Sequence, residues 1–404
     1  MRRINTTAFR IARRGTSREI NRQIALNLVR ERQPLSRADL ARLMGVRPGG
    51  ISRLVNELLE SGLVFEGDKG ESRGGRKPRH LHIETRQRCA IAVDISASRT
   101  QVLVTDLVGH ALTEVSDLPT SRQPQVLVAE VARRIRTILA EHPKAGECVG
   151  LGVVVPGMVA LEGGRLKHCP TLGWRDVDII EPMQLATGLP VVVENDCKAC
   201  ALAQVWAVTG GAEMDGPTAF VNVSDGVGVG IAIDGKLLRG AHNASGEFGH
   251  VSLNMYGPRC SCGQRGCWEA YVSQRATTVR YLGLDLSWSG SAEPTEPTVQ
   301  EIIARARARE VRAVEALLET GYYLGRGFAA IVKAIDPKRI FIGGDITEGW
   351  DLIASTVRDA LREQALIREA GETEIRVVPQ GDYPRLRGAA ALVSAPAFAA
   401  PTVA

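Results

Sequence analysis

The sequence predicts a mixed α/β protein of two similar lobes that follow a small, basic, helical module. Apolar residues recur at helical spacing near the N-terminus, whereas glycine-interrupted strand and helix units fill the rest of the chain. Residues 1–88 carry 20 Lys and Arg against 9 Asp and Glu, and the remaining residues have a net charge of −6. This split in charge is typical of a nucleic-acid-binding module joined to a neutral or acidic body. The alternative is a solvated basic tail.

Length and composition exclude several classes of protein. With 404 residues, of which 44% are hydrophobic, the chain is long enough for two or three domains with cores of their own. It contains no run of 18 apolar residues, and its first segment, MRRINTTAFRIARRG, lacks the apolar stretch of a secretory signal. We therefore expect a cytoplasmic protein with no membrane partner, in which stable disulfides are rare.

The first module has the pattern of a winged helix-turn-helix. Helical spacing predicts a first helix over about residues 17–32, and Ser36 with Asp39 three residues later predicts the start of a short second helix. A turn at Gly45 leads to RPGGISRLVNELLESGLV, whose apolar stripe indicates a third helix that ends before Gly62. In such a motif the last helix lies in the major groove of DNA.

Two groups of residues in this module, residues 1–87, are predicted to contact DNA. Polar residues off the apolar stripe, near the start of the third helix, are expected to face bases and phosphates: Arg47, Ser52, Arg53 and Asn56. Strands at about residues 63–66 and 80–83 flank a basic, glycine-rich loop with the layout of a wing. Its cations suit the minor groove: Arg73, Arg76, Lys77 and Arg79. A flexible linker is the alternative for this loop.

A cluster of cysteines stands out in GEFGHVSLNMYGPRCSCGQRGCWEA, where a disulfide knot, a metal site and chance are the alternatives. A reducing compartment disfavours the disulfides. One imidazole and three thiolates at this spacing suit a closed, tetrahedral, structural zinc site: His250, Cys260, Cys262 and Cys267. Free buried cysteines remain the other interpretation of the pattern, and we expect the five cysteines outside this segment to lie in the core.

A helix-turn-helix followed by GEFGH and CSCGQRGCWE resembles the ROK family, named for repressors, open reading frames and kinases. The resemblance implies an actin-like, duplicated ribonuclease H fold over residues 88–404, with a sugar site between its lobes. Lobe one is expected at about 88–197 with a C-terminal helix at about 380–398, and lobe two at about 198–379 with the zinc. Family members with the extra module are mostly repressors of sugar genes, whereas shorter members are sugar kinases.

The resemblance also implies a set of sugar-binding residues. Asn195 and Asp196 of VEND match the kinase motif whose aspartate is the general base, and the other matching positions are Glu247, His250 and Glu269, with a backbone contact from Gly157. Carboxylates and a carboxamide grip vicinal hydroxyls directionally, so an absent hydroxyl leaves a buried polar group unpaired.

Two departures from the kinase pattern decide between the family's functions. The kinases' DIGGTK is DISASR here, so Ser96 and Ala97 replace the glycines of the first phosphate loop. The second loop has Asp225 where a hydroxyl should face the nucleotide, and like charges at about 4 Å repel by roughly 4 kcal/mol at an effective dielectric of 20.

We therefore predict no enzyme activity, with Asp196 a vestigial base. The expected protein is a sugar-responsive, DNA-binding regulator that acts as a homodimer or homotetramer on a palindromic operator. One alternative is an ATP-dependent sugar kinase that retains a DNA-binding domain. Another is a DNA-binding regulator whose lobes serve only dimerisation.

Overall fold

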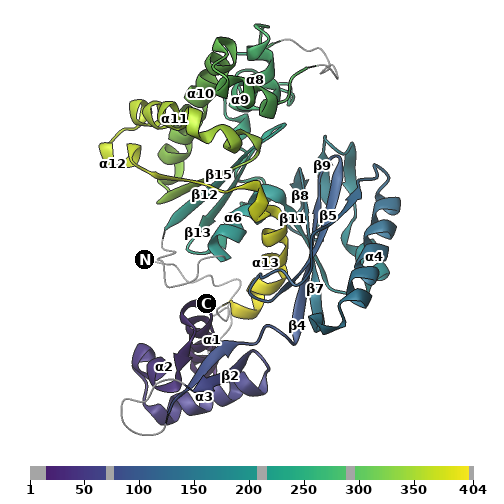
Figure 1. Cartoon of the computed structure of the whole chain (residues 1–404), viewed down its shortest axis with the longest axis vertical. Helices are drawn as coiled ribbons and strands as arrows, with labels where there is room; N and C mark the ends of the chain where they lie inside the picture. The colour runs from purple at the N-terminus through teal and green to yellow at the C-terminus, as the bar shows by residue number, and fades with distance from the viewer. Residues whose placement is uncertain (1–14, 70–76, 207–215, 288–295, 400–404) are drawn as a thin grey trace.

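The computed structural model describes residues 15–69, 77–206, 216–287 and 296–399 of the chain. Figure 1 shows a small N-terminal domain at the foot of two larger lobes, each built round a central sheet. No helix within the described ranges is long and apolar enough to cross a membrane.

Three helices form the N-terminal domain, as the sequence predicts: α1 (Thr16–Arg32), α2 (Arg37–Met44) and α3 (Pro48–Glu60). Ser36 and Asp39 cap α2 reciprocally, because the Asp39 N–H donates to Ser36 Oγ at 3.1 Å and the Ser36 N–H donates to Asp39 Oδ2 at 3.1 Å. Gly45 ends α2 in the left-handed region, which sets the turn into α3. The apolar stripe of α3 packs against α1 and α2 in the core of the domain.

The wing is longer than the sequence predicts. Strands β2 (Val64–Lys69) and β3 (Arg79–Ile83) pair antiparallel beyond the expected ranges 63–66 and 80–83, because an irregularity in β2 lets the pairing continue after Glu66. A two-residue strand that was not expected, β1 (Leu35–Ser36), pairs with β3. Residues 70–76 of the predicted wing loop lie outside the described ranges.

The two lobes repeat one sheet topology. The first sheet contains β4 (Arg88–Ile95), β5 (Arg99–Asp106), β6 (Ser116–Pro119), β7 (Glu147–Val155) and β11 (Val191–Asn195), in the order β11-β7-β4-β5-β6. The second contains β12 (Pro217–Val223), β13 (Val227–Ile233), β14 (Lys236–Leu237), β15 (Arg339–Gly343) and β16 (Glu374–Val377), in the order β14-β13-β12-β15-β16. In both, three antiparallel strands are extended by two parallel ones, which is a duplication.

Different helices cover the outer face of each sheet. Helix α4 (Pro124–Glu141) buries its apolar side on the first sheet. The long helix α10 (Val311–Ile335) and α11 (Trp350–Gln364) do the same on the second. The smaller elements are β8 (Met158–Val159), β9 (Leu166–Cys169), β10 (Trp174–Val177), α5 (Ile180–Thr187), α7 (Glu269–Val272), α8 (Gln274–Tyr281), α9 (Val299–Arg307) and α12 (Arg368–Gly371).

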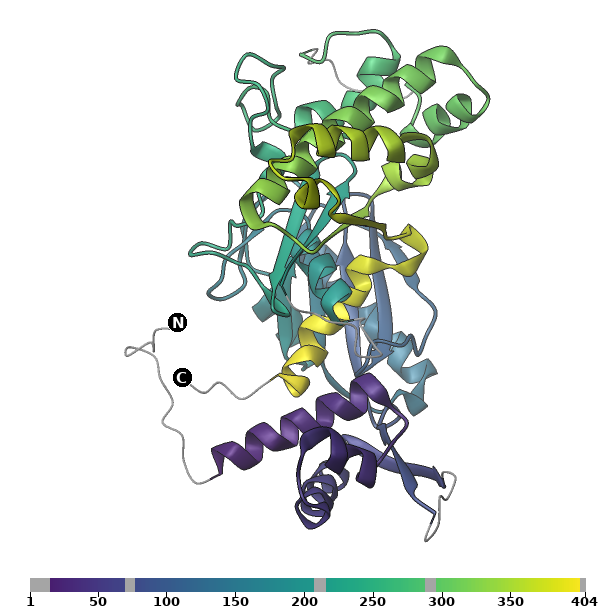
Figure 2. The same cartoon turned by 90° about the vertical axis from the view of Figure 1, so that its left-hand side faces the viewer.

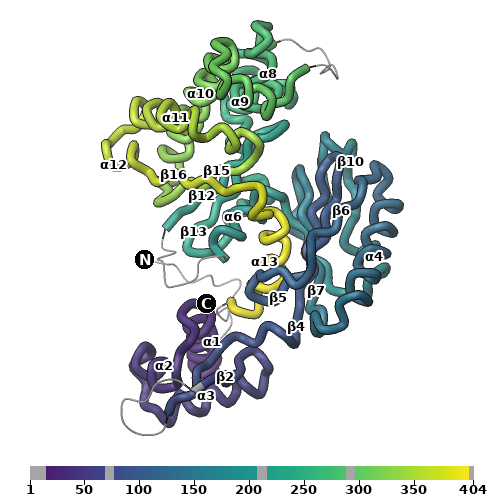
Figure 3. The backbone as a smooth tube through the Cα atoms, in the orientation of Figure 1, coloured from purple at the N-terminus to yellow at the C-terminus, as the bar shows by residue number. Residues whose placement is uncertain are grey.

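Two helices lie side by side between the sheets, and each packs on the sheet of the other lobe. Helix α6 (Asp196–Trp206) follows the first sheet in sequence, but its Cys200 and Ala201 pack with Phe220 of the second. Helix α13 (Pro384–Phe398) follows the second sheet, but it packs on β4, β5 and β7 of the first. The lobes are therefore joined by two helices that each pack on the opposite lobe; Figures 1 and 3 show them next to each other.

The N-terminal domain packs on the end of this helix pair. Asn27 Nδ2 of α1 donates to the Phe398 carbonyl at 2.7 Å, and Gln23 Nε2 donates to the Ala397 carbonyl at 3.3 Å. The Arg30 guanidinium lies 4.3 Å from the ring centroid of Trp206, the last residue of α6. Figure 2 shows α1 running beneath the end of α13, so the N-terminal domain shares a core with the lobes.

We predict that Gly152→Ala loosens α13 from the first sheet. A Cβ on Gly152 of β7 would lie 1.9 Å from the Ala389 carbonyl oxygen, so the helix must shift. The expected cost is about 1–3 kcal/mol of unfolding free energy, measured from the denaturant midpoint. The matched control is Gly381→Ala, because a Cβ there meets nothing within 4 Å. Equal midpoints for the two variants would contradict the assigned contact.

Candidate functional site

The third helix presents the predicted DNA-contacting residues on one face. Because α3 buries Ile51, Leu54, Val55 and Leu58, the opposite face is free, and Arg47, Arg53 and Asn56 are exposed there. Ser52 is half-buried, and its hydroxyl donates to the Pro48 carbonyl at 3.1 Å.

In the wing, the structure describes only part of the predicted set. Lys77 and Arg79 are exposed, whereas Arg73 and Arg76 lie outside the described ranges. Arg79 Nη1 lies 3.7 Å from Glu66 Oε2. Sequence reasoning missed Arg37, which donates to Glu66 at 2.9 Å and to the Ser52 carbonyl at 3.4 Å. It ties α2 to both the wing and α3, and no spacing in the sequence indicates that role.

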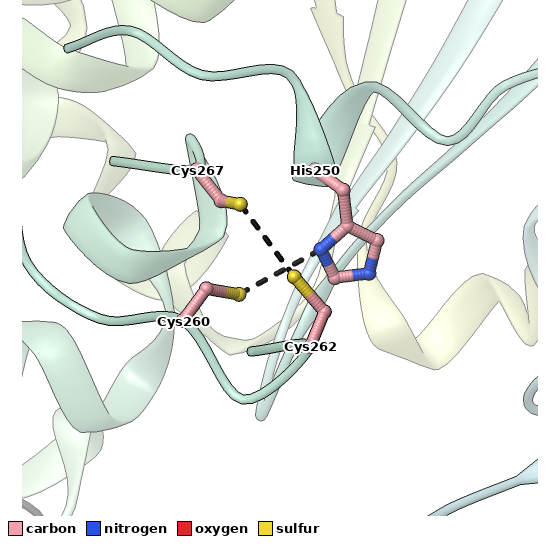
Figure 4. A group of neighbouring side chains, drawn as sticks. All are labelled: His250, Cys260, Cys262 and Cys267. Carbon is pink, nitrogen blue, oxygen red and sulfur yellow. Dashed lines mark hydrogen bonds between the residues drawn. The ribbon is translucent and has the colours of Figure 1, made fainter. Parts of the chain in front are cut away.

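The four predicted metal ligands converge on one point in lobe two (Figure 4). One ligand atom from each residue lies within 4.8 Å of every other, namely from His250, Cys260, Cys262 and Cys267. The Cys262 and Cys267 sulfurs are 3.7 Å apart, and the Cys260 sulfur is 3.7 Å from His250 Nδ1. Tetrahedral zinc with Zn–S bonds of about 2.3 Å has ligand–ligand distances of ~3.8 Å, so the donor set and its spacing fit that ion.

The loop that carries these ligands is fixed by close backbone approaches. Gly266 has φ near +69°, and a Cβ there would lie 1.6 Å from the Asn254 carbonyl oxygen, so only glycine fits next to Cys267. Burial raises the pKa of the Cys260 thiol to about 12 and raises that of Cys267. A divalent cation therefore has to displace protons from these thiols, which makes its binding weaker as the pH falls.

A second cluster forms where β11 meets α6. Asn195 Nδ2 donates to the Gly157 carbonyl at 3.0 Å and to Asp196 Oδ1 at 3.1 Å. The same Asp196 oxygen accepts from the Cys197 N–H at 2.9 Å. The structure thus brings Gly157, Asn195 and Asp196 together, with the carboxylate at the N-terminus of α6, where the helix dipole stabilises negative charge.

An arginine that sequence reasoning missed lies beside this cluster. Arg385 of α13 places Nη2 at 3.1 Å from Asp196 Oδ2 and Nε at 3.1 Å from Asp94 Oδ1, at the end of β4. Burial raises the pKa of Asp94 to about 6, despite the adjacent guanidinium. Burial alone would lower the pKa of Arg385, but the carboxylates of Asp94 and Asp196 raise it above its ordinary value, which keeps the side chain charged.

The remaining predicted sugar contacts lie in lobe two. Glu247 and His250 are exposed at the short 3-10 turn Phe248–His250. Glu269 instead accepts from the Val227 N–H at 3.0 Å and from the Ser261 hydroxyl at 3.0 Å. These bonds link the loop of predicted metal ligands, residues 260–267, to the β12–β13 turn. Within the described part of the chain, no hydrogen bond or ion pair joins these three side chains to Asn195 or Asp196.

A buried polar network joins the lobes next to this cluster. Glu194 of β11 accepts from Arg239 Nε at 2.8 Å and from Asn243 Nδ2 at 3.2 Å. Lys198 Nζ donates to the carbonyl and, at 2.8 Å, to the side-chain oxygen of Asn243. Burial lowers the pKa of Lys198. Arg239 and Asn243 come from the loop after β14, so these bonds hold the second lobe on the first.

Comparison with known proteins agrees with this architecture. Residues 90–395 match the model of the ROK family. The chain belongs to the ROK family. Residues 20–76 match the model of the MarR family, which covers the helix-turn-helix and part of the wing.

Relatives of this ROK chain span both of its parts. A protein named xylose repressor from Bacillus spizizenii is 29% identical over 342 residues, which are 84% of this chain and 86% of that one. The DNA-binding transcriptional dual regulator NagC of Escherichia coli is 27% identical over 380 residues, or 93% and 92% of the two chains.

Solved ROK structures share the fold. A ROK family transcriptional regulator, described as a homolog of the E. coli MLC protein, has a TM-score of 0.76 at 24% identity and covers 95% of this chain and 97% of its own. A ROK family glucokinase from Streptomyces griseus, solved with glucose and AMPPNP, has a TM-score of 0.60 at 26% identity over 75% of this chain and 98% of its own. The two-lobed α/β fold with an N-terminal helix-turn-helix is confirmed.

Backbone hydrogen bonds close the two turns that correspond to the predicted departures from the kinase pattern. The Ser96 N–H donates to the Arg99 carbonyl at 3.0 Å, and the Ser96 hydroxyl donates to the same oxygen at 2.6 Å. In the β12–β13 turn the Ser224 N–H donates to the Gly226 carbonyl at 3.0 Å, and Asp225 is exposed. Ala97 is likewise exposed at the tip of the first turn.

We predict that the purified chain binds one zinc ion and that Cys262→Ser removes most of it. Loss of one thiolate from a four-ligand site opens the coordination sphere to water and lowers affinity steeply. Metal content is measured by elemental analysis after dialysis against a weak chelator. Cys148→Ser is the matched control, because Cys148 lies in lobe one, away from the cluster. Equal zinc content in both variants would rule out this ligand set.

Proposed function

We propose that this ROK chain is a sugar-responsive DNA-binding transcriptional repressor of carbohydrate uptake or catabolism genes, acting in the cytoplasm. The observation that carries the proposal is the match, across helix-turn-helix and lobes together, to relatives named xylose repressor and NagC. The shared core between α1 and the end of α13 supports it, because a DNA-binding domain packed on the lobes responds to their rearrangement.

Three sets of residues are assigned roles in this proposal. DNA is contacted by Arg47, Ser52, Arg53, Asn56, Arg73, Arg76, Lys77 and Arg79. The effector sugar is held by Gly157, Asn195, Asp196, Glu247, His250 and Glu269. A structural zinc ion on His250, Cys260, Cys262 and Cys267 orders the loop that carries Glu247, in keeping with the distances among the four ligand atoms.

We infer that the chain does not phosphorylate its sugar. The closed turn at Ser96 and the carboxylate of Asp225 disfavour nucleotide phosphates. The alternative, a kinase that keeps a DNA-binding domain, is favoured by the likeness to the glucokinase.

The regulator is proposed to act as a homodimer or homotetramer on a palindromic, double-stranded operator. Paired winged modules match two half-sites, and phosphate contacts make the affinity fall as salt rises. Because linkage is reciprocal, sugar and operator weaken each other's binding by the same factor.

We predict that Arg53→Ala weakens operator binding by about five- to a hundredfold, the usual effect of losing one base contact. Arg53 is exposed on α3, so its removal leaves the fold intact. A binding sequence is first selected from random duplex DNA with the full chain, and affinities are then measured at fixed salt. Arg358→Ala, an exposed arginine of α11 in lobe two, is the control and is expected to bind like the unmodified protein.

We predict tight binding of one sugar without turnover of MgATP. Calorimetric titration with a panel of sugars and sugar phosphates is combined with a coupled assay for ADP. Release of the selected DNA by the sugar that binds would establish a ligand-controlled repressor. ADP formation that is abolished by Asp196→Asn would instead replace this proposal with the kinase.

A further inference from the structure

Asp94, Arg385 and Asp196 form a charged cluster, called here the arginine cluster, whose hydrogen bonds are incomplete. Arg385 Nε and Nη2 and Asp94 Oδ1 are shielded from water, and none of the three atoms has a hydrogen-bond partner. The nitrogen–oxygen distances of 3.1 Å are those of ion pairs, but the N–H directions miss the carboxylate oxygens. Asp94 as a whole is only 6% exposed, so bulk water has little access to it.

Such an arrangement is costly in the free protein. Buried polar atoms without hydrogen bonds lose the free energy of hydration, and the attraction within the ion pairs offsets only part of that loss. The cluster is nevertheless open on one side, because the Arg385 side chain is 25% exposed and that of Asp196 is 13% exposed. A hydroxyl group that reaches this side can accept from Arg385 Nη1, which is not among the shielded atoms, and donate to the Asp196 carboxylate.

Charge decides which ligand suits the cluster. Two carboxylates and one guanidinium leave a net charge of −1 at neutral pH. The nearby cations are already engaged, because Arg239 pairs with Glu194 and Lys198 is bonded to Asn243. A phosphate group at this position would be repelled by the net negative charge of the cluster. A hydroxyl group carries no charge and can both donate and accept hydrogen bonds.

We propose that the arginine cluster is part of the effector site, with Arg385 a specificity-determining residue that hydrogen-bonds a sugar hydroxyl and restricts the effector to an uncharged sugar. This inference rests on the proposed function and extends it. It adds to the binding set a residue from α13, the helix whose other end carries the N-terminal domain.

The test uses the full-length, zinc-loaded chain and the sugar that binds most tightly in the titration panel. The phosphate ester of that sugar is expected to bind at least about tenfold more weakly than the free sugar. Arg385→Ala is expected to lower sugar affinity about ten- to a hundredfold, and Arg385→Lys to recover part of the loss, because lysine keeps the charge without the planar pair of donors. Arg387→Ala, two residues along the same helix, is the matched control and is expected to bind sugar normally.

Monodeoxy analogues of the sugar distinguish a direct contact between Arg385 and a sugar hydroxyl from a merely structural role of Arg385. If Arg385 contacts a hydroxyl, one analogue loses affinity for the unmodified protein but no further affinity for Arg385→Ala. Equal relative losses for both proteins across all analogues would overturn the inference, as would a phosphate ester that binds more tightly than the sugar. Should Arg385→Ala not fold, as judged by zinc content and DNA binding, the same cycle is run with Arg385→Lys. A chain that binds DNA but none of the sugars would instead refute the proposed function itself.

Discussion

Helices α6 and α13 each pack on the sheet of the other lobe, and the rest of the structure depends on this exchange. Each helix completes the core of the lobe to which its preceding strands do not belong. The close approach needs small residues, since a Cβ on Gly388 of α13 would lie 2.2 Å from the Ala199 carbonyl oxygen of α6. Neither lobe can therefore move without carrying a helix that is buried in the other.

The same packing places the binding residues. Asp196 is the first residue of α6 and Arg385 is the second of α13, so the two N-termini meet beside Asp94, the last but one residue of β4. Residues from three distant parts of the chain thus form one cluster, and the network of Glu194, Arg239 and Asn243 braces it from the second lobe. A ligand bound there contacts the elements that join the lobes, which is where a small shift has the largest effect on their relative orientation.

The sequence predicted what is local in the chain. The periodic helices and the Ser36–Asp39 cap depend on neighbouring residues, and the four predicted metal ligands fall within one short segment, so their convergence follows from spacing. The arginine cluster could not be predicted in this way. Arg385 and Asp94 lie far apart in sequence, and a lone arginine near a helix start has no distinguishing pattern.

Tertiary pairing also overrides local signals elsewhere. The strand β1 is two residues long and exists only because β3 pairs with it, and β2 extends past Glu66 because its irregularity is tolerated at the edge of the wing. The resemblance predicts that Glu269 contacts sugar, and in the structure its oxygens accept hydrogen bonds from the Val227 N–H and the Ser261 hydroxyl. That site assignment stays a prediction.

Helix α13 connects the proposed sugar site to the proposed DNA-binding domain. From Arg385 to Phe398 it runs about 20 Å, at 1.5 Å for each residue. One end faces Asp196, and the other accepts hydrogen bonds from Asn27 and Gln23 of α1. Under the proposed function, a sugar that re-orders the arginine cluster would shift α13 and with it the surface on which α1 packs. By the same reasoning, DNA bound to the helix-turn-helix would hold α1 and α13 in place and so disfavour the sugar-bound arrangement of the cluster.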